Sequence, residues 1–133
     1  VAIWKGDRAF AEFAADRIDA VAPPNNFTRA LIVPLRAFAR GEKVMQTIDE
    51  LIAAAGLVPS PSLRVFWSQI GTELYAATGR VEAALDTLEV LVSLPFIDVG
   101  WMDQCPALVS IRGAGRFGQV RAVVAARAAS LWK

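Results

Sequence analysis

Glycine and proline recur along this chain at a nearly constant interval. Gly6, Gly41, Gly79 and Gly115 are separated by 35, 38 and 36 residues, and Pro23, Pro59 and Pro95 by 36 and 36. Each proline follows its glycine by 16 to 18 residues, which matches one helix and a short connection. A period in this range, with a glycine at the turn and a proline at the end, is typical of arrays of helix–turn–helix units.

The stretch from Ser60 to Pro95 shows the unit most clearly. Ser60 is a good N-cap residue, and Pro61 suits a first helical turn, where its missing N–H removes no hydrogen bond. A left-handed turn at Gly79 is expected to end this helix. Two apolar stripes at helical spacing lie on either side of that turn: Leu63, Phe66, Trp67, Ile70, Leu74 and Ala77 before it, and Val81, Ala84, Leu85, Leu88, Leu91 and Val92 after it. Two helices cannot bury both stripes alone, so the unit requires neighbouring helices.

The same periodicity predicts helices along the rest of the chain. Residues 1–5 are expected to be the tail of a helix, and a second helix ends before Pro23 with this buried stripe: Phe10, Phe13, Ala14, Ile18 and Val21. The next helices are predicted over residues 25–41 and 42–55, with Pro34 kinking or restarting the first of them. After Pro95 we expect short helices near Asp98–Asp103 and Pro106–Arg112, and a longer one from Arg116. The prediction is an all-α, right-handed stack of about seven antiparallel helices.

Composition excludes several classes of protein. Hydrophobic residues make up 55% of the chain, but no apolar stretch is long enough to predict a membrane span. The formal net charge is +1, histidine is absent, and Cys105 is the one cysteine. Without histidine the chain lacks the commonest general base and metal ligand, so we expect a buried structural thiol, no metal, no cofactor and no enzyme activity. The lone cysteine fits a reducing, cytoplasmic compartment.

The unit after Ser60 resembles the tetratricopeptide repeat. The resemblance rests on a large residue, an Ile-Gly pair, a leucine or tyrosine, a turn glycine, an alanine, a leucine and a proline: Trp67, Ile70-Gly71, Leu74 or Tyr75, Gly79, Ala84, Leu88 and Pro95. It implies a right-handed α-α superhelix built from tetratricopeptide-like repeats. We divide residues 1–133, as one domain, into degenerate repeats at about 1–23, 25–59 and 60–95 and an irregular capping unit at 96–133. Because the pattern begins in its middle at Val1, we expect a fragment of a longer protein.

Residues 101–132 resemble the closing segment of repeat regions in bacterial signalling proteins, among them serine/threonine kinases, adenylate cyclases and transcriptional regulators. The matching residues are Pro106, Leu108, Ile111-Arg112 and Arg116-Phe117. The resemblance implies a non-enzymatic scaffold or regulatory module. Its partner would be a protein or peptide, another domain of the same chain, or a second copy, with no role for nucleic acid or a membrane.

Two alternatives remain open at this point. Gly113, Gly115 and Gly118 match the glycine spacing of a dinucleotide-binding turn, which would make the chain part of a nucleotide-binding enzyme. No acidic residue follows Asp103, however, so a ribose partner is missing and a plain turn is the preferred interpretation. The second alternative is a purely structural spacer or oligomerisation domain.

Two surfaces are predicted to contact a partner. The first is a groove along the helix after Ser60, for which the pattern places these side chains outside the core: Arg64, Ser68, Thr72 and Tyr75. The second is a basic end formed by Arg112, Arg116 and Arg127, because residues 104–133 carry five basic groups and no acidic one. This basic end is expected to be either a solvated end face or an anion-binding or docking face.

Overall fold

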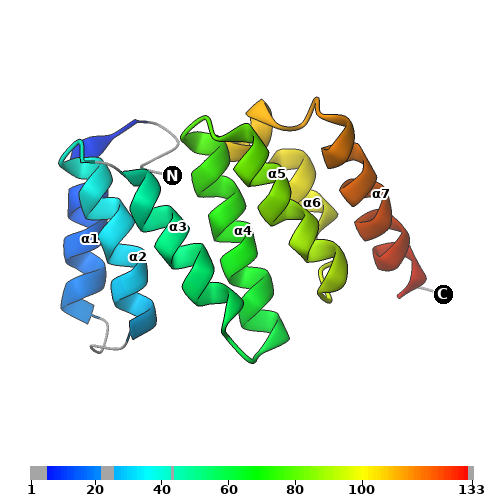
Figure 1. Ribbon diagram of the computed structural model, residues 1–133, viewed down its shortest axis with the longest axis horizontal. Coiled ribbons are helices and arrows are strands. Elements are labelled where there is room, and N and C mark those ends of the chain that lie inside the picture. The colour runs from blue at the N-terminus through cyan, green and yellow to red at the C-terminus, as the bar shows by residue number, and fades with distance from the viewer. Residues whose placement is uncertain (1–5, 22–25, 43, 132–133) are drawn as a thin grey trace. The chain divides into compact units, whose positions relative to one another are not determined.

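The computed structural model describes the backbone of residues 6–21, 26–42 and 44–131 and the side chains of residues 6–21, 32–42 and 46–131. Over these residues the chain is all-α, with no strand, which confirms the predicted class. The helices shown in Figure 1 are α1 (Arg8–Val21), α2 (Asn26–Ala39), α3 (Val44–Gly56), α4 (Pro61–Ala77), α5 (Val81–Val90), the 3-10 helix η1 (Leu91–Ser93), α6 (Val99–Gln104), the 3-10 helix η2 (Pro106–Ser110) and α7 (Gly115–Ser130). The helix expected at residues 1–5 and the marker Pro23 lie outside the described residues.

The chain divides into two compact units, Val1–Ala54 and Ala55–Lys133. In the first unit α1 packs against α2. Asp7 caps α1, because its carboxylate accepts a hydrogen bond from the Phe10 amide at 2.9 Å. Helix α2 continues through Pro34 without restarting. A proline removes one backbone hydrogen bond, and the helix continues on both sides of Pro34.

The buried face of α1 differs from the predicted stripe. Ala11 and Ala15 are fully buried, whereas the side chains of Phe10 and Phe13 are 46% and 58% exposed. The prediction of a buried Phe10–Phe13 stripe is therefore wrong within this unit. Small alanines allow the close approach of α1 and α2, and the larger apolar residues are left on another side of the helix.

Helices α2 and α4 end in the same hydrogen-bonded motif. At Gly41 (φ +69°) the amides of Gly41 and Glu42 donate to the carbonyls of Phe38 and Ala37. The amides of Gly79 (φ +79°) and Arg80 donate in the same pattern to the carbonyls of Ala76 and Tyr75. This is the Schellman arrangement, which needs a left-handed residue and so favours glycine. The predicted turn glycines are thus confirmed at Gly41 and Gly79.

Gly115 does not belong to this series. It has no positive φ and is the first residue of α7. Its place in the periodic spacing reflects the start of a helix, whereas Gly41 and Gly79 each follow the end of one. The periodic glycine marks therefore have two different structural causes.

The second unit is built around α4 and α5, which pack against each other. Ser60 is the N-cap of α4 and Pro61 its first residue, as predicted. Asp98 caps α6 through the Trp101 amide, and η2 packs against α4. Helix α7 packs against α5, α6 and η1. The core of this unit includes Trp67, Leu74, Leu85, Leu88, Leu91, Phe96, Met102, Leu108, Ile111, Phe117, Val120 and Val124.

Candidate functional site

The groove predicted on α4 is closed at its two central residues. Thr72 is fully buried and Tyr75 is 5% exposed, which corrects the expectation that both side chains face an open groove. The Thr72 hydroxyl donates to the carbonyl of Ser68 at 2.7 Å, and the Arg80 guanidinium lies over the Tyr75 ring. The pattern assumed one buried stripe, but residues 71, 72, 74, 75 and 76 of α4 are all buried, so the helix is enclosed on more than one side.

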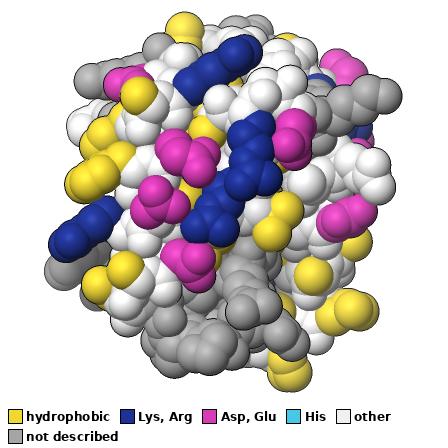
Figure 2. All heavy atoms as spheres, turned by 90° about the vertical axis from the view of Figure 1, so that its left-hand side faces the viewer, with side chains coloured by type: hydrophobic (Ala, Val, Ile, Leu, Met, Phe, Trp, Pro, Cys, Tyr) yellow, Lys and Arg dark blue, Asp and Glu magenta, His cyan; other side chains and the backbone are white. Residues whose placement is uncertain are grey.

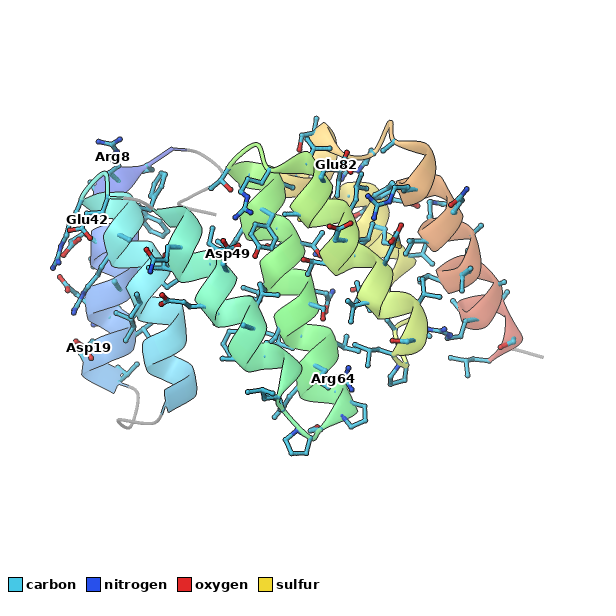
Figure 3. All side chains as sticks on the ribbon, viewed as in Figure 1. Arg8, Asp19, Glu42, Asp49, Arg64 and Glu82 are labelled. Carbon is cyan, nitrogen blue, oxygen red and sulfur yellow. The ribbon has the colours of Figure 1, made fainter. Side chains whose placement is uncertain are left out.

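Arg64 and Ser68, the other two predicted groove residues, are half-buried. Figure 3 shows Arg64 near the first turns of α4. No hydrogen bond or ion pair joins its guanidinium to a described residue. The structure thus leaves two of the four predicted groove side chains accessible, and their role in partner binding stays a prediction.

The arginines of the predicted basic end are engaged within the second unit. Arg112 donates to the carbonyls of Met102 (3.1 Å) and Cys105 (2.5 Å). Arg127 donates to the carbonyls of three alternate residues in the segment after α5, those of Val92 (2.6 Å), Leu94 (2.5 Å) and Phe96 (3.0 Å). These guanidiniums satisfy carbonyls that the ends of short helices leave without partners. Both guanidiniums are thus bonded to carbonyls of the same unit.

Arg116 is held by three carboxylates of α5. It donates to Glu89 at 2.7 and 2.9 Å, to Asp86 at 2.6 Å and to Glu82 at 3.0 Å. The hydrogen bonds from Arg116 lower the pKa of Glu89, and those bonds raise the pKa of Arg116 in turn. Acidic groups therefore already surround this guanidinium, and an anion-binding or docking role of the basic end stays a prediction.

The glycine-rich turn lacks the setting of a dinucleotide site. The residues before it form the 3-10 helix η2, whereas the fingerprint requires a strand leading into a helix. Ala114 is the N-cap of α7, and Arg116 in its first turn points to α5. The geometry is that of a turn between the 3-10 helix η2 and helix α7.

Cys105 occupies a structural position. It is 8% exposed and ends α6, and burial raises the pKa of its thiol above the ordinary value. A raised pKa reduces the thiolate fraction at neutral pH, so this thiol is a poor nucleophile. Among the residues that the structure describes, no group of three potential metal ligands comes together.

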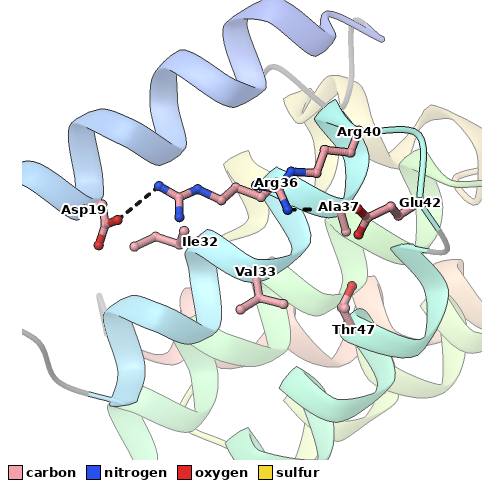
Figure 4. A pocket seen from close by; sticks show the side chains of 8 residues that line it. All are labelled: Asp19, Ile32, Val33, Arg36, Ala37, Arg40, Glu42 and Thr47. Atoms are coloured by element: carbon pink, nitrogen blue, oxygen red, sulfur yellow. Dashed lines mark hydrogen bonds and ion pairs between the residues drawn. The ribbon is translucent and has the colours of Figure 1, made fainter.

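A cavity that the sequence did not predict lies in the first unit. It has a volume of about 430 Å³, and Figure 4 shows its lining: Asp19, Ile32, Val33, Arg36, Ala37, Arg40, Glu42 and Thr47. Ile32, Val33 and Ala37 provide apolar surface, and the charged residues pair with one another. Arg36 donates to Asp19 at 3.0 Å and to Asp16 at 3.2 Å, while Arg40 and Glu42 are 4.0 Å apart.

The charges around this cavity compensate each other. Figure 2 shows this side of the molecule, where basic side chains run between acidic ones. Partial burial disfavours the charge on Arg36, but its hydrogen bonds to Asp16 and Asp19 outweigh that effect and raise its pKa. These ion pairs join α1 to α2. In the sequence, the local sign of this contact is the spacing of Asp16 and Asp19, three residues apart on α1. Their partner Arg36 lies 20 and 17 residues further along the chain, so the sequence alone does not identify it.

Large apolar side chains are exposed on α1 and at the start of α4. Phe10 and Phe13 of α1 have ring centroids 6.1 Å apart, and both rings are accessible. Leu63 and Phe66 of α4 are 46% and 44% exposed. Each pair is three residues apart and therefore lies on one face of its helix.

Comparison with known proteins gives no relative for this chain: no family model, no curated protein and no solved structure matches it. None of the described helices has the length and hydrophobicity that crossing a membrane requires.

Proposed function

We propose that this chain is a non-enzymatic helical-repeat module that binds protein partners through exposed apolar helix faces. The observation that carries the proposal is the pair of large apolar side chains exposed on α1 and again on α4. Isolated exposed apolar residues are common on proteins, but neighbouring ones on one helix face are typical of interaction sites. The three arginines of the basic end already have hydrogen-bond partners within the second unit.

The repeat character of the module is part of the proposal. Its support is the identical Schellman motif that ends α2 and α4, with Gly41 and Gly79 at 38 residues from each other. Together with the resemblance to tetratricopeptide repeats, this favours a superhelical, tetratricopeptide-like arrangement. By the same resemblance we propose a cytoplasmic regulatory role within a larger bacterial signalling protein.

A peptide selection tests the proposed function. The full chain is immobilised and used to select binders from a displayed library of random 16-residue peptides, and their affinities are then measured in solution. We expect saturable binders. Their affinity should fall at least about tenfold for the double variant Phe10→Ser/Phe13→Ser or for Leu63→Ser/Phe66→Ser, because a few large anchor side chains carry most of the binding energy of an interface. Val109→Ser is the matched control, since Val109 is 67% exposed on η2.

Two results would count against the proposed function. One is a selection that yields no saturable binder, as expected for a purely structural spacer. The other is a set of binders whose affinities are the same for both double variants, for Val109→Ser and for the unmodified chain.

A further inference from the structure

Helix α1 has two apolar faces, and the structure covers one of them. The first consists of Ala11 and Ala15, which are fully buried. The second consists of Phe10, Phe13 and Val21, which are 46%, 58% and 74% exposed. A helix that is apolar on two sides normally lies between two neighbours, whereas a surface helix has one apolar stripe. The exposed stripe of α1 therefore has the composition of an interface.

One cation lies within this stripe. Arg17 follows Phe13 by four residues and precedes Val21 by four, which places it on the same face. Its side chain is exposed, and no hydrogen bond or ion pair joins it to any residue that the structure describes. The stripe thus combines apolar surface with one uncompensated positive charge.

The carboxylates of α1 do not neutralise Arg17. Asp16 and Asp19 accept hydrogen bonds from Arg36 of α2, on another side of the helix. Asp7 caps the helix at its start. Glu12 precedes Arg17 by five residues, which is about 140° around the helix axis. Each acidic group of α1 is therefore either engaged elsewhere or turned away from the stripe.

We propose that the Phe10–Phe13–Arg17–Val21 face of α1 binds an amphipathic helix of a protein partner that carries an acidic residue within its apolar stripe. The partner's apolar side chains would cover the two rings and Val21, and its carboxylate would pair with Arg17. The face extends over eleven residue steps, or about 16 Å, so a partner helix of three to four turns spans it. This inference rests on the proposed function and specifies its partner.

Charge argues for a different protein as the occupant and against a second copy. Two copies meeting through this face would bring two Arg17 side chains into one apolar interface, and the face itself has no carboxylate to compensate them. Like charges brought together in a desolvated interface are unfavourable. An acidic partner removes this cost, and it gains a charge-assisted hydrogen bond.

The test uses two 16-residue helical peptides that are identical except at one position. Both have a leucine stripe at positions 4, 8, 11 and 15, and position 12 is glutamate in one peptide and lysine in the other. Binding to the full chain is measured by titration calorimetry at low and moderate salt. We expect the glutamate peptide to bind at least about tenfold more tightly than the lysine peptide, with the difference reduced by salt.

Three variants of the chain sharpen the test. Arg17→Glu should reverse the preference between the two peptides, and Phe13→Ala should weaken the glutamate peptide about tenfold. Val109→Ala is the control and should change neither affinity. Because Phe13 and Arg17 are exposed, all three variants should keep the far-UV circular dichroism of the unmodified chain.

Four outcomes would overturn the inference. One is equal affinity for both peptides. Another is a preference that Arg17→Glu leaves unchanged. The third is self-association in sedimentation that Phe13→Ser abolishes, which would identify a second copy as the occupant. The fourth concerns the library peptides of the proposed-function test. If their affinity depends on Leu63 and Phe66 but not on Phe13, this inference is wrong, whereas the proposed function is still supported.

Discussion

At the scale of single residues, the arginines near the end of the chain show how a basic cluster can serve the fold. Local composition predicts an exposed basic end, because no acidic residue accompanies them in the last thirty positions. Their partners come from elsewhere in the chain: Arg127 bonds carbonyls 31 to 35 residues away, and Arg116 bonds carboxylates 27 to 34 residues away. Contacts at such separations leave no periodic signal, so sequence reasoning could not find them.

Replacing Arg127 tests this structural role. Arg127→Ala leaves the carbonyls of Val92, Leu94 and Phe96 without their donor, in a part-buried setting. Loss of hydrogen bonds to a charged group should lower the free energy of unfolding by about 2–3 kcal/mol. Arg127→Lys should recover only part of this loss, because an ammonium cannot match the guanidinium fork.

Urea denaturation followed by tryptophan fluorescence measures the effect of Arg127→Ala. Arg64→Ala is the control in the same unit, since its guanidinium has no described hydrogen-bond partner, and its effect should stay within about 0.5 kcal/mol. If both alanine variants shift the denaturation midpoint equally, the carbonyl contacts of Arg127 do not stabilise the fold.

At the scale of elements, the sequence predicted most helix positions and the buried stripe of α5, but not the buried faces of α1 and α4. Start and stop signals are local, so Ser60, Asp98 and Gly79 identified the ends of helices correctly. Burial depends on which neighbours surround a helix. Helix α4 is enclosed on several sides, which buries Thr72 and Tyr75, while α1 is covered only on its alanine face. A periodic pattern identifies apolar positions, and it does not identify the face that finds a neighbour.

The glycines of the 36-residue period provide a test at this scale. Gly79 has φ +79° in the Schellman turn after α4, so Gly79→Ala should destabilise the chain by about 1–2 kcal/mol. Gly115 is helical, and a Cβ there meets nothing within 4 Å, so Gly115→Ala should be neutral or stabilising by up to about 1 kcal/mol. Thermal unfolding followed by circular dichroism distinguishes the two. Equal destabilisation by both substitutions would mean that Gly115 also ends a repeat turn.

At the scale of the whole molecule, the two units differ in the kinds of side chain that their described residues bury. The buried residues described in the first unit are mostly small or aliphatic, chiefly Ala11, Ala15, Ile32, Ala37, Ile48 and Leu51, and Phe10 and Phe13 of α1 are exposed. The second has a core of larger side chains, among them Trp67, Leu88, Phe96, Met102 and Phe117. It also has arginine contacts that tie α7 to α5 and α6. Small domains are stable only when such a core outweighs the conformational entropy lost on folding.

We therefore expect residues 55–133 to fold alone and residues 1–54 to remain largely unfolded alone. Each fragment can be produced separately and compared by near-UV circular dichroism and urea titration. Fragment 55–133 should show a cooperative transition and a near-UV signal from Trp67 and Trp101, which pack at 5.3 Å against Phe66 and at 5.6 Å against Phe96. Fragment 1–54 should show neither, because a chain of only 54 residues buries a small share of its surface and is marginally stable alone. A 55–133 fragment without a cooperative transition would show that the burial of its core depends on the first 54 residues.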